Sequence, residues 1–259
     1  MISPAKISAV TLNTFRETVR DRILYNLVFF VLLITAAAIF LGELTAGNEG
    51  RVIVNLGLSV VLIFGVFIAI FVGVGLVSKE IEKRTVYAIF AKPLGRGEFL
   101  IGKYLGLCLT LLVNVAVMAL GISFALLYVG GTSLIGSVWA AALLIYFELT
   151  ILTAVAILFA GFSSPILSAL LTFFVFIIGH FSAALNQLAE SLGSQAAKIF
   201  FAGLYYLLPN LSFFSFTANA AYGELPTFSY IATAFLYALV YVVIVLFVAV
   251  FVFGRRNFK

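Results

Sequence analysis

The feature that most constrains the fold of this chain is a series of long apolar stretches with almost no charged residues inside them. A helix needs about 20 consecutive apolar residues to cross the roughly 30 Å hydrocarbon core of a bilayer. Scanning the sequence for such stretches predicts six transmembrane helices. They cover residues 23–42, 52–77, 100–128, 134–160, 165–185 and 229–253.

Composition also indicates that most of the chain lies in a membrane. Of the 259 residues, 64% are hydrophobic and only 10% are charged, whereas soluble domains are about half apolar and a quarter charged. The 28 Phe and 11 Tyr residues exceed what one core of this size buries. We therefore expect an all-α integral membrane protein in contact with the lipid bilayer, with a single transmembrane domain over residues 1–259.

Lysine and arginine residues gather on one side of the predicted membrane helices, and cytoplasmic loops retain such residues. With the N-terminus inside, all 15 basic residues except Arg51 and Lys198 fall on the cytoplasmic side. Both termini are then cytoplasmic, which predicts a multi-pass protein of the cell inner membrane. The same placement argues against a nucleic-acid partner, because the bases form no soluble patch despite a net charge of +5.

Two segments outside the predicted spans have amphipathic sequences. Residues 4–22 predict an amphipathic helix along the cytoplasmic interface, because Leu12, Phe15 and Val19 share one face and basic residues the other. The alternative is an ordinary charged lead-in to the first span. Residues 186–228 predict an outer amphipathic segment rich in aromatic residues, which suit the headgroup level. That segment either caps the outer end of the bundle or rests on the membrane.

The cytoplasmic loop at residues 78–99 predicts a short surface helix. Glu80 and Glu82 precede Lys83 and Arg84, an order that suits the dipole of a helix beginning near Glu80. Apolar and aromatic residues in the same run offer more surface than a connector needs, which indicates a docking partner. The alternative is a solvated turn whose apolar residues dip into the interface.

This loop resembles the first cytoplasmic loop of ABC type-2 exporter permeases. The resemblance rests on Lys79-Glu80-x-Glu82-x-x-Thr85, then Lys92-Pro93-x-x-Arg96-x-Glu98-Phe99, then Gly102-Lys103. The six-span layout and the interfacial helix also match that family. Within it, the chain is most similar to permeases of the nitrous-oxide-reductase maturation subgroup.

The resemblance implies that the substrate pathway and the ATPase lie on different chains. Two permeases, identical or different, would pair around a central substrate pathway. Two copies of a separate ABC ATPase subunit would bind ATP and Mg²⁺. This chain would then carry no cofactor and no catalytic residue. The resemblance does not decide whether the transporter also has an accessory extracytoplasmic subunit. The coupling helix would run from Glu80 to Phe90. The implied ATPase-coupling residues are Glu80, Glu82, Lys83, Arg84, Thr85, Tyr87 and Phe90.

One run in the loop imitates a nucleotide-binding motif. Gly97-x-x-x-x-Gly102-Lys103 matches a Walker A loop until its last position, where Tyr104 replaces Ser or Thr. A phosphate-binding loop follows a strand and opens a soluble helix, whereas this run enters a membrane span. We therefore expect ATP to bind another chain. A metal site is not expected either, because the chain has one His and one Cys.

Polar residues inside the predicted spans are few. Glu148 lies deep in the fourth span, where a charge costs several kcal/mol unless it is protonated or paired. Asn114 lies at matching depth in the third span, so we expect it, and not His180, to be the partner. A structural role in a hydrogen bond between helices and a role in a substrate or proton pathway both remain open. We expect His180 to be a packing residue and Cys108 to be a small apolar filler.

Small residues recur at helical spacing in two spans and predict close helix contacts in lipid. They leave open whether these contacts lie within one protomer or between two. The residues are Gly65, Ala69 and Gly73 in the second span and Gly102 and Gly106 in the third.

Three function classes follow from these observations. The permease of an ATP-driven exporter accounts for both topology and loop, and the apolar interior of its spans favours lipid-like or amphipathic cargo over a small ion. The alternative is an ion-coupled secondary transporter using Glu148, although such carriers usually hold several intramembrane charges. A membrane enzyme is disfavoured because the sequence has no Gly-x-Ser-x-Gly or His-Glu-x-x-His run.

Overall fold

A computed structural model describes residues 4–19, 47–82, 95–182 and 207–255 and ten single residues between these ranges. Three predicted features therefore lie largely outside the described residues. These are the first span at 23–42, most of the coupling helix and the first half of the outer segment at 186–228.

Within the described ranges the regular structure is helical throughout, and four helices are long and apolar enough to cross a membrane. Their positions agree with four of the six predicted spans. The first, Glu49–Ser78, is formed by α3 (Glu49–Phe67), the π-helix η2 (Ile68–Val72) and the start of α4 (Gly73–Glu82). The others are α6 (Arg96–Tyr128), the 3-10 helix η3 (Thr132–Leu134) continued by α7 (Ile135–Ala160), and α12 (Phe228–Arg255).

The predicted fifth span is shorter than expected. Its helix, α8 (Pro165–His180), has 16 residues, which at 1.5 Å per residue is about 24 Å and less than the hydrocarbon thickness. Ser164 is the N-cap residue and Pro165 occupies the first turn, where the missing N–H of proline costs nothing. The helix therefore has a sharply defined start next to the end of α7.

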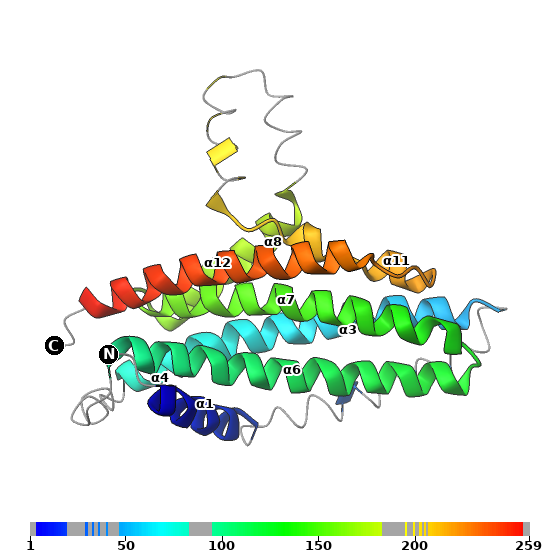
Figure 1. Cartoon of the computed structure of the whole chain (residues 1–259), viewed down its shortest axis with the longest axis horizontal. Helices are drawn as coiled ribbons and strands as arrows, with labels where there is room; N and C mark the ends of the chain where they lie inside the picture. Colours follow the sequence, from blue (N-terminus) through cyan, green and yellow to red (C-terminus); the bar gives the residue numbers. More distant parts are fainter. Residues whose placement is uncertain are drawn as a thin grey trace.

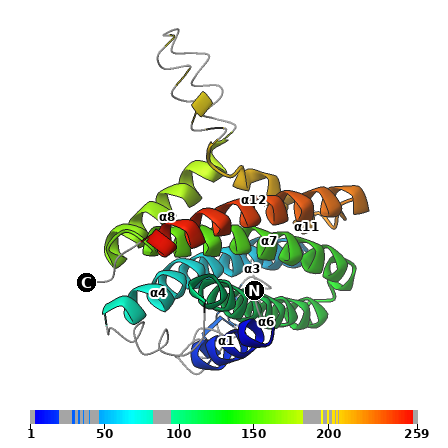
Figure 2. The ribbon, with the colours of Figure 1, turned by 60° about the vertical axis from the view of Figure 1, so that its left-hand side comes forward.

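Helix α7 forms the centre of the bundle, with α3, α4, α6, α8 and α12 packed around it (Figures 1 and 2). Over its most apolar window, 72% of residues are buried within the chain, compared with 22% for α12. The outward side of α12 is apolar, and Phe247 is 75% exposed. A surface of this kind is stable only against lipid or another apolar helix.

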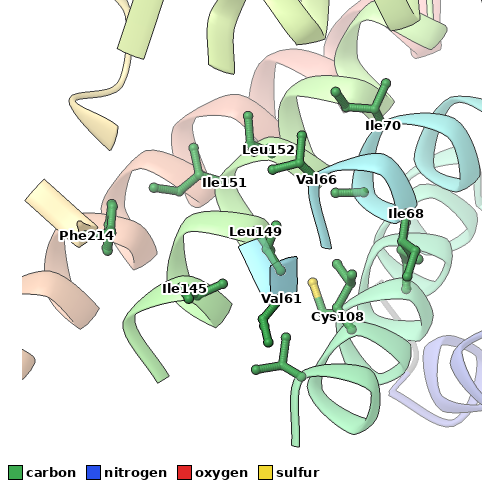
Figure 3. Close-up of a cluster of buried hydrophobic side chains, with 14 of the residues drawn as sticks. Val61, Val66, Ile68, Ile70, Cys108, Ile145, Leu149, Ile151, Leu152 and Phe214 are labelled. Carbon is green, nitrogen blue, oxygen red and sulfur yellow. The ribbon is translucent and has the colours of Figure 1, made fainter. Parts of the chain in front are cut away.

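The buried core is almost entirely aliphatic. Figure 3 shows Val61, Val66 and Ile68 beside Leu149 and Leu152, all of them buried. Cys108 is also buried in this cluster and is not in a disulfide. It occupies the position of a small apolar side chain, as the sequence analysis expects. Most of the stability of such a core in lipid comes from close packing.

The described part of the outer segment belongs to the bundle. The short helices η4 (Leu211–Phe214) and α11 (Thr217–Ala221) pack against α7. Ser137 on α7 donates a hydrogen bond of 2.8 Å to the carbonyl oxygen of Ala220, and the Phe214 side chain is fully buried. These residues therefore form a packed cap, which differs from an aromatic layer lying freely at the headgroup level.

Candidate functional site

One end of the bundle brings together four segments that are distant in the sequence. The helix α1 (Pro4–Thr18), the last turn of α4, the first turns of α6 and the last turn of α12 lie side by side there (Figures 1 and 2). Every described base except Arg51 belongs to these segments: Lys6, Arg16, Lys79, Arg96, Lys103 and Arg255. We call this region the basic end.

Helix α1 lies against α6 because two glycines allow the backbones to approach closely. A Cβ atom on Gly102 would lie 2.6 Å from Val10 Cβ, and one on Gly106 would lie 2.8 Å from the Thr11 carbonyl oxygen. The face of α1 that packs there includes Thr14, which is fully buried, while Leu12 on another face is 50% exposed. A helix is therefore present over Pro4–Thr18 of the predicted residues 4–22, and it packs on the bundle.

Alanine at position 106 should destabilise the contact between α1 and α6. The added methyl group would meet backbone that cannot move cheaply, at a cost of about 1–3 kcal/mol, although alanine favours a helix by about 1 kcal/mol over glycine. Gly136→Ala is the matched control, because its nearest neighbour in space is Leu225 Cδ2 at 3.7 Å. Thermal unfolding in detergent should show a lower midpoint for Gly106→Ala than for Gly136→Ala, and equal midpoints would contradict the assignment.

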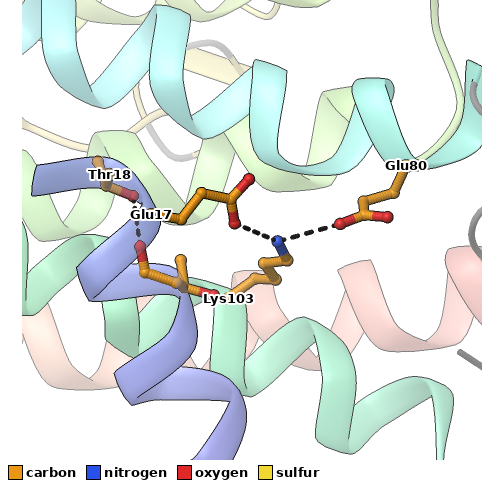
Figure 4. A network of polar contacts seen from close by, with 5 residues as sticks. Glu17, Thr18, Glu80 and Lys103 are labelled. Atoms are coloured by element: carbon orange, nitrogen blue, oxygen red, sulfur yellow. Dashed lines mark hydrogen bonds and ion pairs between the residues drawn. The ribbon is translucent and has the colours of Figure 1, made fainter. Parts of the chain in front are cut away.

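Lys103 connects three of the segments at the basic end. Its Nζ lies 3.3 Å from Glu17 Oε2 on α1 and 3.3 Å from Glu80 Oε1 on α4 (Figure 4). The Lys103 side chain is 5% exposed, compared with 49% for Glu17 and 21% for Glu80. A buried ammonium group is stable only when it is paired, so the three residues hold α1, α4 and α6 together. We call Glu17, Glu80 and Lys103 the lysine bridge.

Further contacts fix the start of α6 against the rest of the basic end. Glu98 Oε2 accepts a hydrogen bond of 2.9 Å from the Gly95 backbone N–H, which closes the first turn. The Arg96 guanidinium donates a 2.7 Å hydrogen bond to the Gly254 carbonyl oxygen at the end of α12. The Phe99 and Phe253 rings stack with centroids 6.4 Å apart. The end of α12 is therefore attached to the same turns of α6 as the lysine bridge.

The structure differs from the sequence prediction at the start of the coupling helix. Glu80 and Glu82 belong to α4, which continues the second span through Glu82. No glycine or proline after Gly75 interrupts this run, so the helix extends past the apolar stretch. The two acids therefore do not form the first turn of a separate helix beginning near Glu80. Five other predicted coupling residues lie outside the described part: Lys83, Arg84, Thr85, Tyr87 and Phe90.

Glu148 is fully enclosed in the bundle, and its neighbour is not the one predicted. Glu148 is 1% exposed, and its Oε1 lies 3.6 Å from His180 Nε2. Asn114 is also buried, but its Nδ2 has no hydrogen-bond partner among the described residues. The expectation that Asn114 partners Glu148 is therefore wrong. Depth along the predicted spans does not determine which side chains meet, and α8 approaches α7 so that His180 comes near the carboxyl group.

The predicted packing residues lie at helix contacts within the chain. Gly65 lies against Leu149 of α7, Ala69 is fully buried, and a Cβ on Gly73 would lie 3.2 Å from Ala156 Cβ. Helix α1 packs against Gly102 and Gly106, as described above. Small residues thus bring α3 and α4 close to α7, and α1 close to α6.

An apolar groove of about 550 Å³ lies between the second span and α8. Phe67, Phe71 and Val74 line one side, and Ile166, Leu170 and Phe173 line the other. The π-helix η2 forms part of the first side, and π-helices often occur at functional sites. Sequence analysis missed this groove, because apolar residues that line a groove and those that face lipid have the same composition.

The chain matches a family model described as "ABC-2 family transporter protein" over residues 8–258. The chain belongs to this family. No curated protein matches it. The ABC-2 family and the four membrane-length helices together establish a multi-pass membrane protein that is the permease component of an ABC transporter. The permease is a transport component and not itself the catalytic one.

The Walker-like run has a structural role in this ABC-2 permease. Residues 97–104 lie inside α6, where the backbone N–H groups beyond the first turn are used within the helix and cannot cradle a phosphate. Lys103 is held by two carboxylates. No group of three or more His, Cys, Asp or Glu side chains that could hold a metal ion occurs in the described part of the permease.

Proposed function

We propose that this chain is the permease subunit of an ATP-driven exporter, that two copies or two related permeases form the substrate pathway, and that a separate ATPase subunit drives them. ATP and Mg²⁺ are then bound by the ATPase. The observation that carries this proposal is the match to the ABC-2 family over nearly the whole chain. The lysine bridge at the basic end supports it, because it supplies a connection through which movement of a docked partner can reach several helices.

The proposed topology places the basic end in the cytoplasm. The described bases other than Arg51 gather there, and cytoplasmic segments retain such residues. Both termini are then cytoplasmic, and residues 23–42 and α8 complete six spans in the cell inner membrane. Within the family we propose the nitrous-oxide-reductase maturation subgroup, to whose permeases the chain is most similar.

The proposed mechanism transmits force from the ATPase to the membrane helices. A coupling segment that follows α4, within residues 83–90, docks on the ATPase, and closure of two ATPase subunits displaces it. Because Glu80 is paired with Lys103, and Lys103 with Glu17, the displacement moves α4, α6 and α1 together. Packed helices of this kind switch between discrete arrangements and do not deform continuously. The second and third spans then tilt against the second permease, and the pathway opens outward.

The apolar groove beside α8 is an argument for amphipathic cargo. Its described walls are built from aliphatic and aromatic residues, and Ile166 at its edge is 84% exposed. A small hydrated ion would lose its water in such a place at a large cost. Membership of the ABC-2 family favours this mechanism over an ion-coupled carrier using Glu148.

Co-purification tests the proposed function. The full-length permease, isolated from its native membrane, should carry an ATPase with it. Glu82→Ala and Tyr87→Ala should each reduce the amount retained, by about tenfold if the residue contributes about 1.4 kcal/mol to docking. Tyr222→Ala is the matched control, since Tyr222 is 68% exposed and lies beside Arg51, at the end of α3 remote from the lysine bridge. Equal retention by the Tyr87 and Tyr222 variants would contradict docking through this loop.

A further inference from the structure

Glu148 is the only acid or base among residues 104–179. Its carboxyl group is buried, and within the described part of the chain Oε1 has no hydrogen-bond partner. The distance of 3.6 Å to His180 Nε2 is slightly beyond that of a direct hydrogen bond. An acceptor of this kind inside a membrane bundle is costly to leave unsatisfied. The arrangement therefore indicates a site that another polar group completes.

The hydrogen bonds of His180 determine how many protons the pair holds. Nδ1 lies 3.3 Å from the Phe176 carbonyl oxygen, which can only accept, so Nδ1 carries a hydrogen. When the two side chains close to hydrogen-bond distance, Nε2 either accepts from a protonated Glu148 or donates to its carboxylate. In both cases the pair holds one shared proton and has no net charge, the form that a low-dielectric interior favours.

In the described part of the chain, no ion pair joins Glu148 or His180 to a further charged group. The helices packed around α7 are α3, α4, α6, α8 and α12, and their Asp, Glu, Lys and Arg residues lie near helix ends. The remaining titratable groups along their middle parts are tyrosine and cysteine side chains, whose ordinary pKa values lie above neutral pH, so they carry no charge there. They are Tyr104 and Cys108 on α6, Tyr146 on α7, and Tyr237 and Tyr241 on α12.

His180 lies on the same face of α8 as residues that line the apolar groove. Ile166, Leu170 and Phe173 line the groove, and the same helical spacing of three and four residues continues through Ile177 to His180. The distance from Ile166 to His180 along the helix is about 21 Å. The His180 side chain is 23% exposed, whereas that of Glu148 is 1% exposed. The imidazole is thus the accessible part of the polar pair.

We propose that the groove and the pair of Glu148 and His180 form a binding site for a cationic amphiphile, with its hydrocarbon part in the groove and its cationic head at the pair. This inference rests on the proposed function and names its cargo class. A bound monovalent cation replaces the shared proton, which leaves to water, so the site stays neutral. An anionic head would need a second cation, and residues 104–179 contain no lysine or arginine.

Binding to the full-length permease in phosphatidylcholine nanodiscs tests this assignment without any ATPase. The probes are dodecylammonium, whose head has three N–H donors, and the neutral dodecyl maltoside, each corrected for binding to empty nanodiscs. The wild-type protein should bind the cation about tenfold more tightly than the neutral probe, as one ion pair in a dry site predicts. Calorimetry in buffers of different ionisation enthalpy should detect release of about one proton per bound cation, from the single shared proton.

Glu148→Gln should abolish both the preference for the cation and the proton release. Its unchanged binding of the neutral probe would show that the groove is still folded. Glu224→Gln is the control, because it also removes one acid but lies outside the spans, where its Oε2 accepts a hydrogen bond from Asn219. Equal binding of both probes to the wild-type protein, or a preference that survives in Glu148→Gln, would overturn the proposal. Because no ATPase is present, failure here leaves the ATPase co-purification result intact.

Discussion

Replacing Lys103 with methionine should reduce ATP-dependent transport by about tenfold or more, because a coupling of about 1.4 kcal/mol or more between helices would be lost. The substitution keeps the apolar stem of the side chain but removes the charge that pairs with Glu17 and Glu80. Both acids are partly exposed, so water screens them and the loss of stability should be only about 1 kcal/mol. ATP hydrolysis by the associated ATPase should continue. The expected phenotype is therefore uncoupling rather than unfolding.

Matched variants separate this role from a general effect of charge. Arg255→Met removes a base from the same end of the bundle, but Arg255 is exposed and lies over the Phe251 ring. It should transport normally, and Lys103→Arg should retain most activity. Between the acids, Glu80→Gln should impair transport more than Glu17→Gln, since Glu80 is 21% exposed and Glu17 is 49% exposed. Parallel loss of hydrolysis and transport in Lys103→Met would argue against a coupling role.

Leucine at position 65 should prevent stable folding of the bundle. A Cβ atom on Gly65 would overlap the Leu149 side chain, which is fully buried in α7. Overpacking of this kind costs about 1–3 kcal/mol for a few methylene groups and more where the backbone must move. The measurement is the yield and unfolding midpoint of the protein in detergent. Both should fall strongly for Gly65→Leu.

A second substitution tests whether Leu149 is the cause. Leu149→Ala alone leaves a cavity and should cost about 2–5 kcal/mol. The double variant Gly65→Leu with Leu149→Ala exchanges a large and a small residue across the contact, so it should be more stable than the sum of the single effects predicts. Additive effects would mean that positions 65 and 149 do not meet in the folded protein.

The sequence predicted the helices best where one strong physical signal decides the outcome. Long apolar runs predicted the four membrane-length helices, because hydrocarbon permits few other backbone structures. The loop motif between Lys79 and Lys103 predicted the family that the comparison then confirmed. The glycine spacing at Gly102 and Gly106 predicted a close contact. It could not identify α1 as the partner, because small residues accept any helix that fits.

Predictions failed where the outcome depends on which side chains meet in space. The position of Asn114 suggested a partner for Glu148, but the approach of α8 brings His180 to that carboxyl group instead. The lysine bridge was also missed, although its members were visible as acids and a base bordering apolar stretches. A lysine just inside a predicted span, near acids in two other segments, was the available signal. The π-helix η2 and the groove beside it gave no sequence signal.

Reconstitution of purified components into liposomes tests the central claim most directly. That claim is that force produced by a separate ATPase enters this helix bundle through its basic end. Uptake of a labelled cationic amphiphile into liposomes should require the permease, its ATPase partner and ATP together, and Lys103→Met should remove it while hydrolysis continues. Transport by the permease alone, driven by a proton gradient and lost in Glu148→Gln, would contradict the account.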